Sequence, residues 1–364
     1  GGEQYQAQAL VSACGQLNRP LEPHLPGLET FKGETFHSAR WNTAYDLTGK
    51  RVAVIGTGAS AIQFIPQIAP QVAQLHVFQR SAAYVLSKPD RAYRPWEIAL
   101  MGRMPWLQKL DRGLKYVQHE ARVLAFTVVP KLMTAMQVMF RQNLKRGIHN
   151  PALRERLVPD YPMGCKRILI SNDFYPALAR ANVEVVDERI EAVTETAIRT
   201  ADGKAREVDA IIYGTGFAAT EFLSPMQITG LRGQDLNTAW KEGAEAYLGI
   251  SVSGFPNLFI LYGPNTNLGH NSILYMLESQ FAYVLGCIRH LQEQRLRYLD
   301  LKPQVQAQFN QQLQKSVEHS VWQQGCTSWY KTASGKNTVN WPGFTFTYRH
   351  HTRRPELSHY DCVR

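Results

Sequence analysis

The chain has 364 residues, of which 44% are hydrophobic and 19% are charged, a composition typical of a folded protein with enough length for two domains or one large composite domain. Its formal net charge is +10, but no dense basic run with interleaved aromatic residues occurs, so we expect an enzyme with an anionic ligand and no nucleic acid partner. The five cysteines are scattered and form no CxxC pair, which indicates a reducing, cytoplasmic setting and argues against a dithiol redox site or a cysteine-rich zinc site; no metal is expected.

The first readable element is an apolar run over residues 7–13 that leads into Cys14 and Gly15. The run has the pattern of an interior strand whose neighbours in a sheet would come earlier, and the chain begins with Gly1-Gly2 instead of methionine. We therefore expect a sequence truncated at its N-terminus. Residues 16–49 are rich in Pro and Gly, which predicts a linker or crossover loop.

Residues 51–69 predict a strand, a glycine turn and a helix. In such a unit Gly56 allows the tight turn, Gly58 lets the backbone approach a pyrophosphate, and Ala61 keeps the helix close to the strand. Amides at the N-terminus of the helix bind phosphate. The turn residues expected to bind the cofactor are Gly56, Thr57, Gly58, Ala59 and Ser60.

The next strand, residues 75–78, ends in Gln79, Arg80 and Ser81. An NAD site usually ends this strand with an acidic residue that binds the ribose 2′-hydroxyl. A guanidinium beside a hydroxyl suits a 2′-phosphate instead, because the planar fork of arginine binds phosphate through two hydrogen bonds. We predict that Arg80 and Ser81 bind NADPH; the alternative is that Arg80 is an ordinary solvated arginine.

Residues 90–157 predict helices with Arg and Lys on one side and apolar residues on the other. Their most apolar part, residues 123–140, contains Pro130 and Lys131 and is bounded by arginines, which does not suit a transmembrane span. We expect a buried or substrate-facing helical insertion. A peripheral membrane contact is the less favoured alternative.

The second half of the chain begins with predicted strands over residues 183–217, including a hairpin at Asp202-Gly203. A further strand at 257–262 ends in Gly263, Pro264 and Asn265, and a helix is expected from about 272 to 294. The aromatic tail beyond this helix is expected to be irregular.

One motif points to a class of enzyme. Residues Phe31, Gly33, His37 and Trp41 match FxGxxxHxxxW, which resembles the fingerprint of type I Baeyer–Villiger monooxygenases. Related N-hydroxylating and flavin-containing monooxygenases usually carry an aromatic residue other than Trp at the last position. Asn42 is a small departure, since the family commonly has Pro or Asp there.

A second motif covers residues 209–217 and includes Gly214 and Gly216. It is similar to the strand and glycine turn that return the chain from the NADPH domain to the FAD domain in two-dinucleotide flavoproteins. The resemblance covers essentially the whole chain, and it places the sequence as the middle and C-terminal part of such an enzyme.

The resemblance implies an α/β fold, a two-dinucleotide-binding-domain flavoprotein with Rossmann-like FAD and NADPH domains and a helical insertion. Such enzymes carry two GxGxxG units and this chain has one, so the first FAD βαβ unit is expected to be missing. The expected domains are residues 1–45, a remnant of the FAD-binding domain and linker with the fingerprint; 46–215, the NADPH-binding domain with the insertion at about 90–157; and 216–364, the C-terminal part of the FAD-binding domain with substrate and lid loops.

The same resemblance implies roles for two cations. Residues 165–169 look like the segment that bears the active-site arginine, so Arg167 would be catalytic: it would stabilise the negatively charged flavin peroxide and contact the nicotinamide. Lys166 would help Arg80 to hold the 2′-phosphate. The alternative is that Lys166 and Arg167 are surface charges before a strand.

Other roles follow from the resemblance. His37 would be a hydrogen-bonding pivot between the two domains and would transfer no proton. Trp329 would lie in a mobile loop that closes over NADP, with a plain core role as the alternative. The FAD contacts in this chain would be Gly15, Gly216 and Asn265, the last from a turn whose amides face the flavin.

The implied function is an NADPH- and FAD-dependent oxygen insertion through a C4a-peroxyflavin, which converts a ketone to an ester or lactone. One alternative is N- or S-oxygenation of a heteroatom substrate, against which Trp41 and the Lys166-Arg167 pair argue. Another is a non-catalytic NADP(H)-binding chain. The absent CxxC argues against a flavin disulfide reductase. The expected partners are therefore a small-molecule ketone or heteroatom substrate and O₂, and the sequence specifies no oligomeric state.

Overall fold

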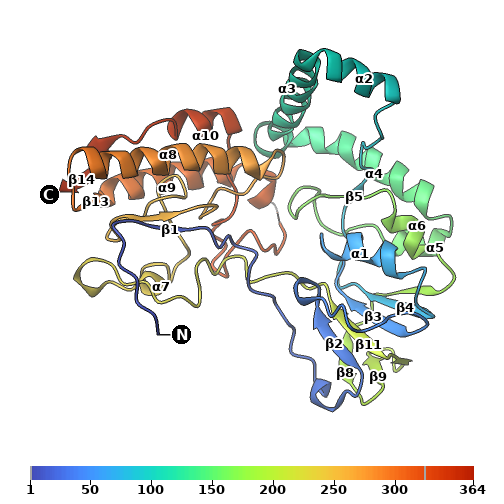
Figure 1. The fold of residues 1–364 in the computed structure, drawn as a ribbon. Coiled ribbons are helices and arrows are strands. Elements are labelled where there is room, and N and C mark those ends of the chain that lie inside the picture. Colours follow the sequence, from blue (N-terminus) through green and yellow to red (C-terminus); the bar gives the residue numbers. More distant parts are fainter. Residues whose placement is uncertain (1, 324) are drawn as a thin grey trace.

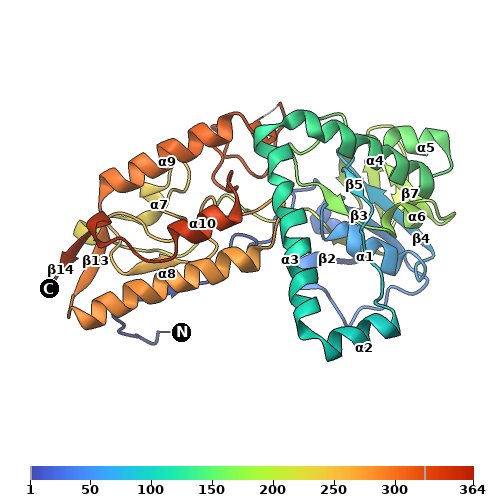
Figure 2. The ribbon, with the colours of Figure 1, turned by 90° about the horizontal axis from the view of Figure 1, so that it is seen from above.

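Figure 1 shows two lobes joined by a few extended segments; the computed structural model describes residues 2–323 and 325–364. One lobe contains a parallel sheet, and the other contains the helices α8 (Ile273–Glu293), α9 (Pro303–Glu318) and α10 (Thr345–His351). Both ends of the chain lie on the second lobe, and Figure 2 shows the same division from above.

The sheet of the first lobe has five strands, and every neighbouring pair is parallel. In spatial order they are β2 (Glu34–His37), β11 (Ala210–Tyr213), β3 (Arg51–Ile55), β4 (Gln74–Phe78) and β7 (Val183–Val186). The central strands carry fully buried branched residues such as Val52 and Val54, as expected for a parallel sheet that is covered on both faces.

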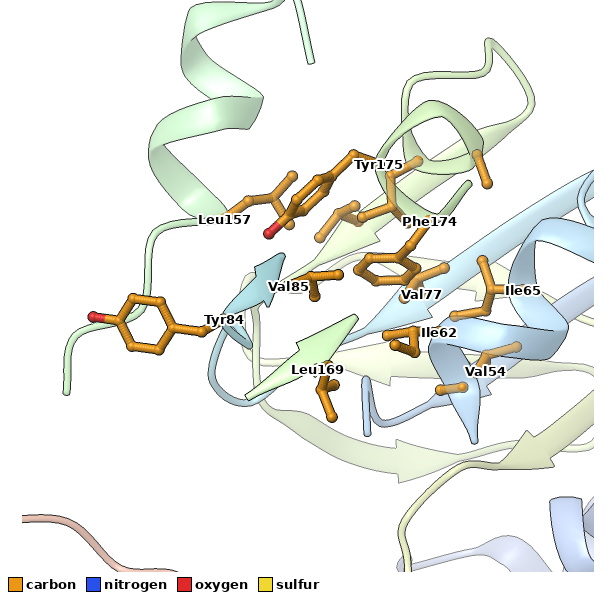
Figure 3. Packing of buried hydrophobic residues seen from close by; sticks show 14 of the residues in the cluster. Val54, Ile62, Ile65, Val77, Tyr84, Val85, Leu157, Leu169, Phe174 and Tyr175 are labelled. Atoms are coloured by element: carbon orange, nitrogen blue, oxygen red, sulfur yellow. The ribbon is translucent and has the colours of Figure 1, made fainter. Parts of the chain in front are cut away.

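Helix α1 (Ala61–Ile68) connects β3 to β4 and covers one face of this sheet. Its isoleucines recur with helical spacing, so Ile62 and Ile65 both point inward. Figure 3 shows them packed over Val54 and Val77, with Phe174 of α6 (Phe174–Leu178) beside them. The predicted strand–turn–helix–strand unit is confirmed.

Helices follow β4 and the short strand β5 (Val85–Leu86), which pairs in parallel with β6 (Leu169–Ile170). They are α2 (Pro95–Arg103), α3 (Pro105–Ala121), α4 (Met133–Gly147) and α5 (Pro151–Arg156), with a π-helical turn at Leu124–Val128. In both views α3 stands at the boundary of the two lobes, where Thr345 of α10 donates from Oγ1 to the buried Glu120 carboxylate at 2.9 Å.

The apolar content of these helices does not make a single membrane span. Within the described residues, no one helix has the length and hydropathy to cross a bilayer. Pro105–Val128 and Met133–Gly147 have the required length and hydropathy only when they are taken together, and the chain is bent by 113° at the break between them.

A small antiparallel sheet completes the first lobe. It contains β8 (Ile190–Val193), β9 (Ala197–Thr200) and β10 (Ala205–Glu207). The tight connection between β9 and β10 contains Asp202-Gly203, with Gly203 at a φ of +76°, so the predicted hairpin is confirmed.

In the second lobe β1 (Leu10–Ser12) pairs in parallel with β12 (Leu258–Ile260). The pair precedes α8, which begins one residue after the predicted start at Ser272. Strands β13 (Tyr298–Leu301) and β14 (Tyr360–Val363) form an antiparallel pair. The same lobe also contains a short helix, α7 (Leu236–Ala239).

Two sequence expectations about this lobe need correction. The first strand occupies Leu10–Ser12 and not the whole of 7–13, because only these residues find partners in β12. The tail is not irregular: α9, α10 and β14 are regular, and their aromatic residues Tyr348 and Tyr360 are buried core. Helix α9 is rich in glutamine and has few apolar residues, so its sequence carries a weak helical pattern, and tertiary packing supplies most of the stability of such a helix.

The fold predicts that Gly33 is required in the fingerprint for steric reasons. A Cβ at Gly33 would collide with the carbonyl oxygen of Asp209 and with the ring of Phe31. Gly33→Ala should therefore lower the free energy of unfolding by about 1–3 kcal/mol. Gly113→Ala in α3 is the matched control, because its Cβ would meet nothing within 4 Å, and it should stabilise the helix by up to about 1 kcal/mol. Urea denaturation of both variants makes the comparison; equal stabilities would contradict the steric account.

Candidate dinucleotide-binding and active site

The glycine turn after β3 is held tightly against the end of β11. Gly56 has a φ of +103°, and a Cβ there would lie 2.6 Å from the carbonyl oxygen of Gly214. Its N–H donates to the carbonyl of Phe78 at 2.9 Å. On the other side, a Cβ at Gly214 would lie 3.1 Å from the Cβ of Ala61. Small residues at all three positions thus allow the turn, the helix and the strand to meet.

The turn leaves donors free at the start of α1. Within residues 2–323 and 325–364, no hydrogen bond uses the N–H groups of Thr57, Gly58, Ala59 or Ser60. Gly58 is exposed, and its Cβ would make only an ordinary 3.7 Å contact with Gly214. Unpaired amides at the positive end of a helix bind anions, so this turn has the donors for a pyrophosphate.

The end of β4 carries a cluster of positive charge. Lys166 reaches Ser81 from 85 residues away in the chain and donates from Nζ to Oγ at 3.1 Å. Burial and the neighbouring Arg80 both lower the pKa of Lys166, with burial the larger cause. Among the described residues, no carboxylate forms an ion pair with Arg80 or Lys166. Asp160 lies near enough to raise the pKa of Lys166 slightly against these two causes, but it forms no ion pair there among the described residues, so two adjacent cations and a hydroxyl are left for an anion such as a phosphate.

An acidic residue next to this cluster is neutralised by partners that the sequence did not reveal. Asp187, just after β7, accepts from Gln79 Nε2 at 2.8 Å and pairs with Arg156 Nε at 2.5 Å. Gln79 is buried and also donates to the carbonyl of Arg156 at 3.0 Å. Asp187 is thus engaged by Gln79 and Arg156, and within the described residues it forms no ion pair with Arg80. Nothing in the spacing of these residues signals the contact.

The two connections between the lobes are hydrogen-bonded to each other. The N–H of Leu21 donates to the carbonyl of Gly216 at 2.9 Å, and that of Ala218 donates to the carbonyl of Arg19 at 3.0 Å. Gly216 has a φ of +86°, so its backbone conformation is one that favours glycine.

His37 lies at this junction. Its Nε2 is 3.0 Å from the carbonyl oxygen of Gly216, and its Nδ1 accepts from the N–H of Ala39 at 3.1 Å. These partners assign the proton to Nε2 in a neutral ring, which donates to Gly216. Burial lowers the pKa of His37, which keeps the ring neutral. The geometry suits the predicted pivot role.

The rest of the fingerprint packs around the dinucleotide unit. Trp41 makes edge-on contacts with Phe36 of β2, at 5.1 Å between ring centroids, and with Phe64 of α1, at 5.2 Å. Phe31 packs against the buried cluster on the other face of the sheet. The fingerprint residues therefore position the helix and strands that form the turn.

Arg167 stands exposed on the first lobe beside two tyrosines, Tyr262 and Tyr330. Burial raises the pKa of both tyrosines, and the positive charge of Arg167 opposes the rise in both. In the described part of the chain the guanidinium forms neither a hydrogen bond nor an ion pair. The structure thus brings a free cation to the boundary of the lobes.

The second lobe meets Arg167 with residues that follow β1. A Cβ at Gly15, whose φ is +67°, would lie 3.6 Å from the ring of Tyr262. The next residue, Gln16, is 4% exposed, and its side chain lies beside Tyr262, whose pKa it lowers; neither its Nε2 nor its Oε1 has a partner at hydrogen-bond distance in residues 2–323 and 325–364. A buried amide without partners is costly, so this side chain is suited to a ligand.

Of the predicted residues, Asn265 contacts the segment 326–340 and Trp329 lies within that segment. Asn265 is buried; its Nδ2 donates to the carbonyls of Asn337 and Asn340 at 2.9 and 3.2 Å. Trp329 is half-buried, with its ring 4.5 Å from that of Tyr330. Asn265 therefore fixes this segment to the turn after β12, whereas Trp329 has a face left for a further contact.

The cysteines differ from expectation. Cys165 and Cys326 form a disulfide between residues 161 positions apart, with their Cα atoms 6.3 Å apart. The sequence did not predict this pairing, because a pairing made by tertiary contact leaves no local spacing signal.

The fold and site together are those of a nucleotide-binding flavoprotein monooxygenase. The family model described as FMO-like, flavin-binding monooxygenase-like, matches residues 8–228. A Baeyer-Villiger monooxygenase of Pseudomonas aeruginosa is 49% identical over 361 residues, covering 99% of this chain and 68% of that protein. One of Streptomyces coelicolor is 44% identical over 360 residues, covering 98% and 69%.

Solved structures agree. An oxidized steroid monooxygenase bound to NADP is similar with a TM-score of 0.84 and 29% identity, covering 98% of this chain and 75% of that one. A closed cyclohexanone monooxygenase has a TM-score of 0.84 and 25% identity, with the same coverage. The chain belongs to the flavin-binding monooxygenase-like family, and the predicted family and two-domain flavoprotein fold class are confirmed.

The junction predicts an acid-sensitive contribution of His37 to stability. Because its folded pKa is lowered, the contribution is complete above the ordinary pKa of about 6.5 and is lost as pH falls from there towards the folded pKa. His37→Gln should lower the free energy of unfolding by about 1–2 kcal/mol at pH 8 and weaken its decline between pH 7 and pH 5. Urea titrations across this range test it, with the exposed His24→Gln as control. An unchanged pH profile in the His37 variant would rule out this role.

Proposed function

We propose that the protein is an NADPH- and FAD-dependent Baeyer–Villiger monooxygenase that inserts one atom of O₂ into a small-molecule ketone to give an ester or lactone. The observation that carries the proposal is the short segment Lys166-Arg167, which contributes one cation to the cluster at Ser81 and the next to the boundary of the lobes. The names of the Pseudomonas and Streptomyces relatives support the reaction type.

The NADPH site in this proposal uses the first lobe. The free amides of residues 57–60 take the pyrophosphate, and the cluster of Arg80, Ser81 and Lys166 takes the 2′-phosphate. The glycine turn fits the cofactor because Gly58 is exposed and a Cβ there would make only an ordinary 3.7 Å contact with Gly214.

The FAD site in this proposal uses the carboxyl ends of β1 and β12. Ligands of parallel strands bind at these ends, and there the chain has the sharp turn at Gly15 and the buried, unpaired amide of Gln16. Gly216 would complete the contacts of this chain with FAD, together with the side-chain oxygen of Asn265, because the N–H and Nδ2 of Asn265 already donate to carbonyls of residues 337–340. When bound, FAD supplies the activation of oxygen and NADPH supplies the hydride.

Arg167 is proposed as the catalytic residue. Its guanidinium carries no competing carboxylate among the described residues, so its charge is available to an oxygen on which negative charge develops. Tyr262, which is half-buried, and Tyr330, which is buried, lie beside the exposed guanidinium. Trp329, on the segment next to Tyr330, would cover the nicotinamide.

The proposed domains follow the lobes except at β2, which lies in the sheet of the first lobe although residues 1–45 were assigned to the FAD-binding part. Residues 46–215 form the NADPH-binding domain with the insertion at about 90–157, and residues 1–45 and 216–364 belong to the FAD-binding part. His37 and Gly216 bond where these parts join. A cytoplasmic location suits NADPH as the coenzyme.

Arg80→Ala should weaken NADPH binding selectively. Loss of one charge-assisted phosphate contact costs about 1.5–3 kcal/mol, which raises the dissociation constant about tenfold or more. NADH lacks the phosphate and should bind as before. Equilibrium titration with both coenzymes gives the answer, and Arg189→Ala, which removes the same charge from a 79% exposed side chain, is the control. Equal losses for NADPH and NADH would exclude the assignment.

Arg167→Ala should keep FAD but lose ester formation. Removing about 3 kcal/mol of electrostatic stabilisation slows oxygen insertion about a hundredfold, so NADPH oxidation becomes uncoupled and releases hydrogen peroxide. The ester formed per NADPH consumed, with a simple cyclic ketone, measures this. Arg199→Ala on the exposed face of β9 is the control. A ratio of ester to NADPH near the parent value would disprove the role of Arg167. If the parent enzyme is given both a ketone and a sulfide and forms a sulfoxide but no ester, heteroatom oxygenation is favoured.

A further inference from the structure

The Cys165–Cys326 pair lies directly beside the residues of the proposed site. Cys165 is fully buried and immediately precedes Lys166 and Arg167. Cys326 is half-buried and stands three residues before Trp329. The pair therefore connects the segment that carries both cations to the start of the segment 326–340, which is here named the Trp329 loop.

Packing brings these two places together independently of the bond. A Cβ at Gly164 would lie 2.9 Å from Cγ2 of Val321, so the turn before Cys165 fits closely against the chain before Cys326. The ring of Trp322 packs against Phe126 and Tyr330 at 5.9 and 6.5 Å. The separation of 6.3 Å between the cysteine Cα atoms is within the range that a disulfide spans without backbone movement. The two thiols are thus positioned to react with each other.

The far half of the Trp329 loop is anchored to the second lobe. Asn265 holds the backbone at Asn337 and Asn340, and Lys336 pairs with Glu245 at 2.6 Å. Tyr330 and Val339 pack in the core of the first lobe. With the disulfide formed, the loop is fixed at its beginning as well as at its end. With two thiols, residues 326–329 are held only by packing and by the local hydrogen bonds that Ser328 accepts from the N–H groups of Tyr330 and Lys331.

We propose that Cys165 and Cys326 are a peroxide-sensitive modification site, whose reversible oxidation fixes the Trp329 loop over bound NADP(H) and slows its exchange. The oxidant is hydrogen peroxide, which an uncoupled flavin monooxygenase releases; only this source and the identity of the coenzyme rest on the proposed function. In a reducing compartment such a disulfide is transient, as redox-sensing disulfides are.

The chemistry balances with one peroxide. Cys326, the more exposed of the two, attacks as the thiolate and breaks the O–O bond, giving a sulfenic acid and hydroxide, which takes up the thiol proton to become water. The sulfur of Cys165 then forms the S–S bond and displaces the sulfenic oxygen as a second water with its proton. Two electrons pass from the sulfurs to the peroxide, and a dithiol reductant reverses the change.

The first test identifies the site without measuring activity. The enzyme is reduced, treated with hydrogen peroxide, alkylated and digested, and its peptides are identified by mass spectrometry. We expect the Cys165 and Cys326 peptides to be joined and the other three cysteines to stay alkylated. Cys362→Ser should leave this result unchanged, and Cys326→Ser should abolish it. Oxidation of Cys14 or Cys362 in place of the pair would overturn the proposal.

The second test measures the coupling to the coenzyme. If oxidation raises the affinity for NADP⁺, thermodynamic reciprocity requires NADP⁺ to stabilise the disulfide by the same factor, about fivefold or more. Redox titration with a dithiol buffer, with and without NADP⁺, measures this factor, and displacement of bound NADP⁺ measures the slowed release. Cys165→Ser should bind NADP⁺ normally and lose the peroxide effect on release. The coupling is overturned if NADP⁺ does not change the stability of the disulfide and the disulfide does not change the release of NADP⁺. If NADP⁺ fails to bind the reduced enzyme, the proposed function is refuted, and the mass spectrum still decides the modification site.

Discussion

The site depends on one steric constraint, the approach of Gly56 to the carbonyl of Gly214. At this point the turn after β3 and the turn after β11 leave the same edge of the sheet, and a Cβ at Gly56 would lie 2.6 Å from that carbonyl. The first turn leads into the helix whose amides are free. The second leads through Gly216 to the other lobe, where His37 and Leu21 bond to it. Binding of a dinucleotide and the connection of the lobes are therefore built on adjacent residues.

Charge supplies what the backbone does not. In the proposed function the sheet edge offers amides to a pyrophosphate, and Arg80 and Lys166, whose mutual repulsion an anion relieves, would select a phosphorylated coenzyme. The next residue, Arg167, places its charge beside Tyr262, so one pair of neighbouring residues would serve both binding and reaction.

Much of this could be predicted from the sequence where the signal is local. The apolar run before Gly56 and the isoleucine spacing after it predicted β3 and α1, and the Asp202-Gly203 pair predicted a hairpin that the structure contains. The helix expected at 272–294 is observed at Ile273–Glu293. In each case a turn residue or a periodic pattern lies within the element itself.

Long-range contacts could not be predicted in this way. Gln79 with Asp187, Cys165 with Cys326, and the unpaired amide of Gln16 are defined by residues that tertiary structure brings together. The Lys166–Ser81 contact was an exception, because Ser81, from its place at the strand end, and Lys166, from the family resemblance, had been assigned to the same phosphate. The C-terminal helices were missed since their stability comes from packing of Tyr348 and its neighbours and not from a strong local pattern.

The central claim is that the glycine turn at Gly56 holds NADP(H) and that the cations at the end of β4 read its 2′-phosphate. A crystal structure of the enzyme with NADP⁺ tests this directly. The account predicts pyrophosphate density over the amides of residues 57–60 and the 2′-phosphate within hydrogen-bond distance of Arg80, Ser81 and Lys166. A flavin pyrophosphate at the Gly56 turn, or a 2′-phosphate away from these three side chains, would contradict it.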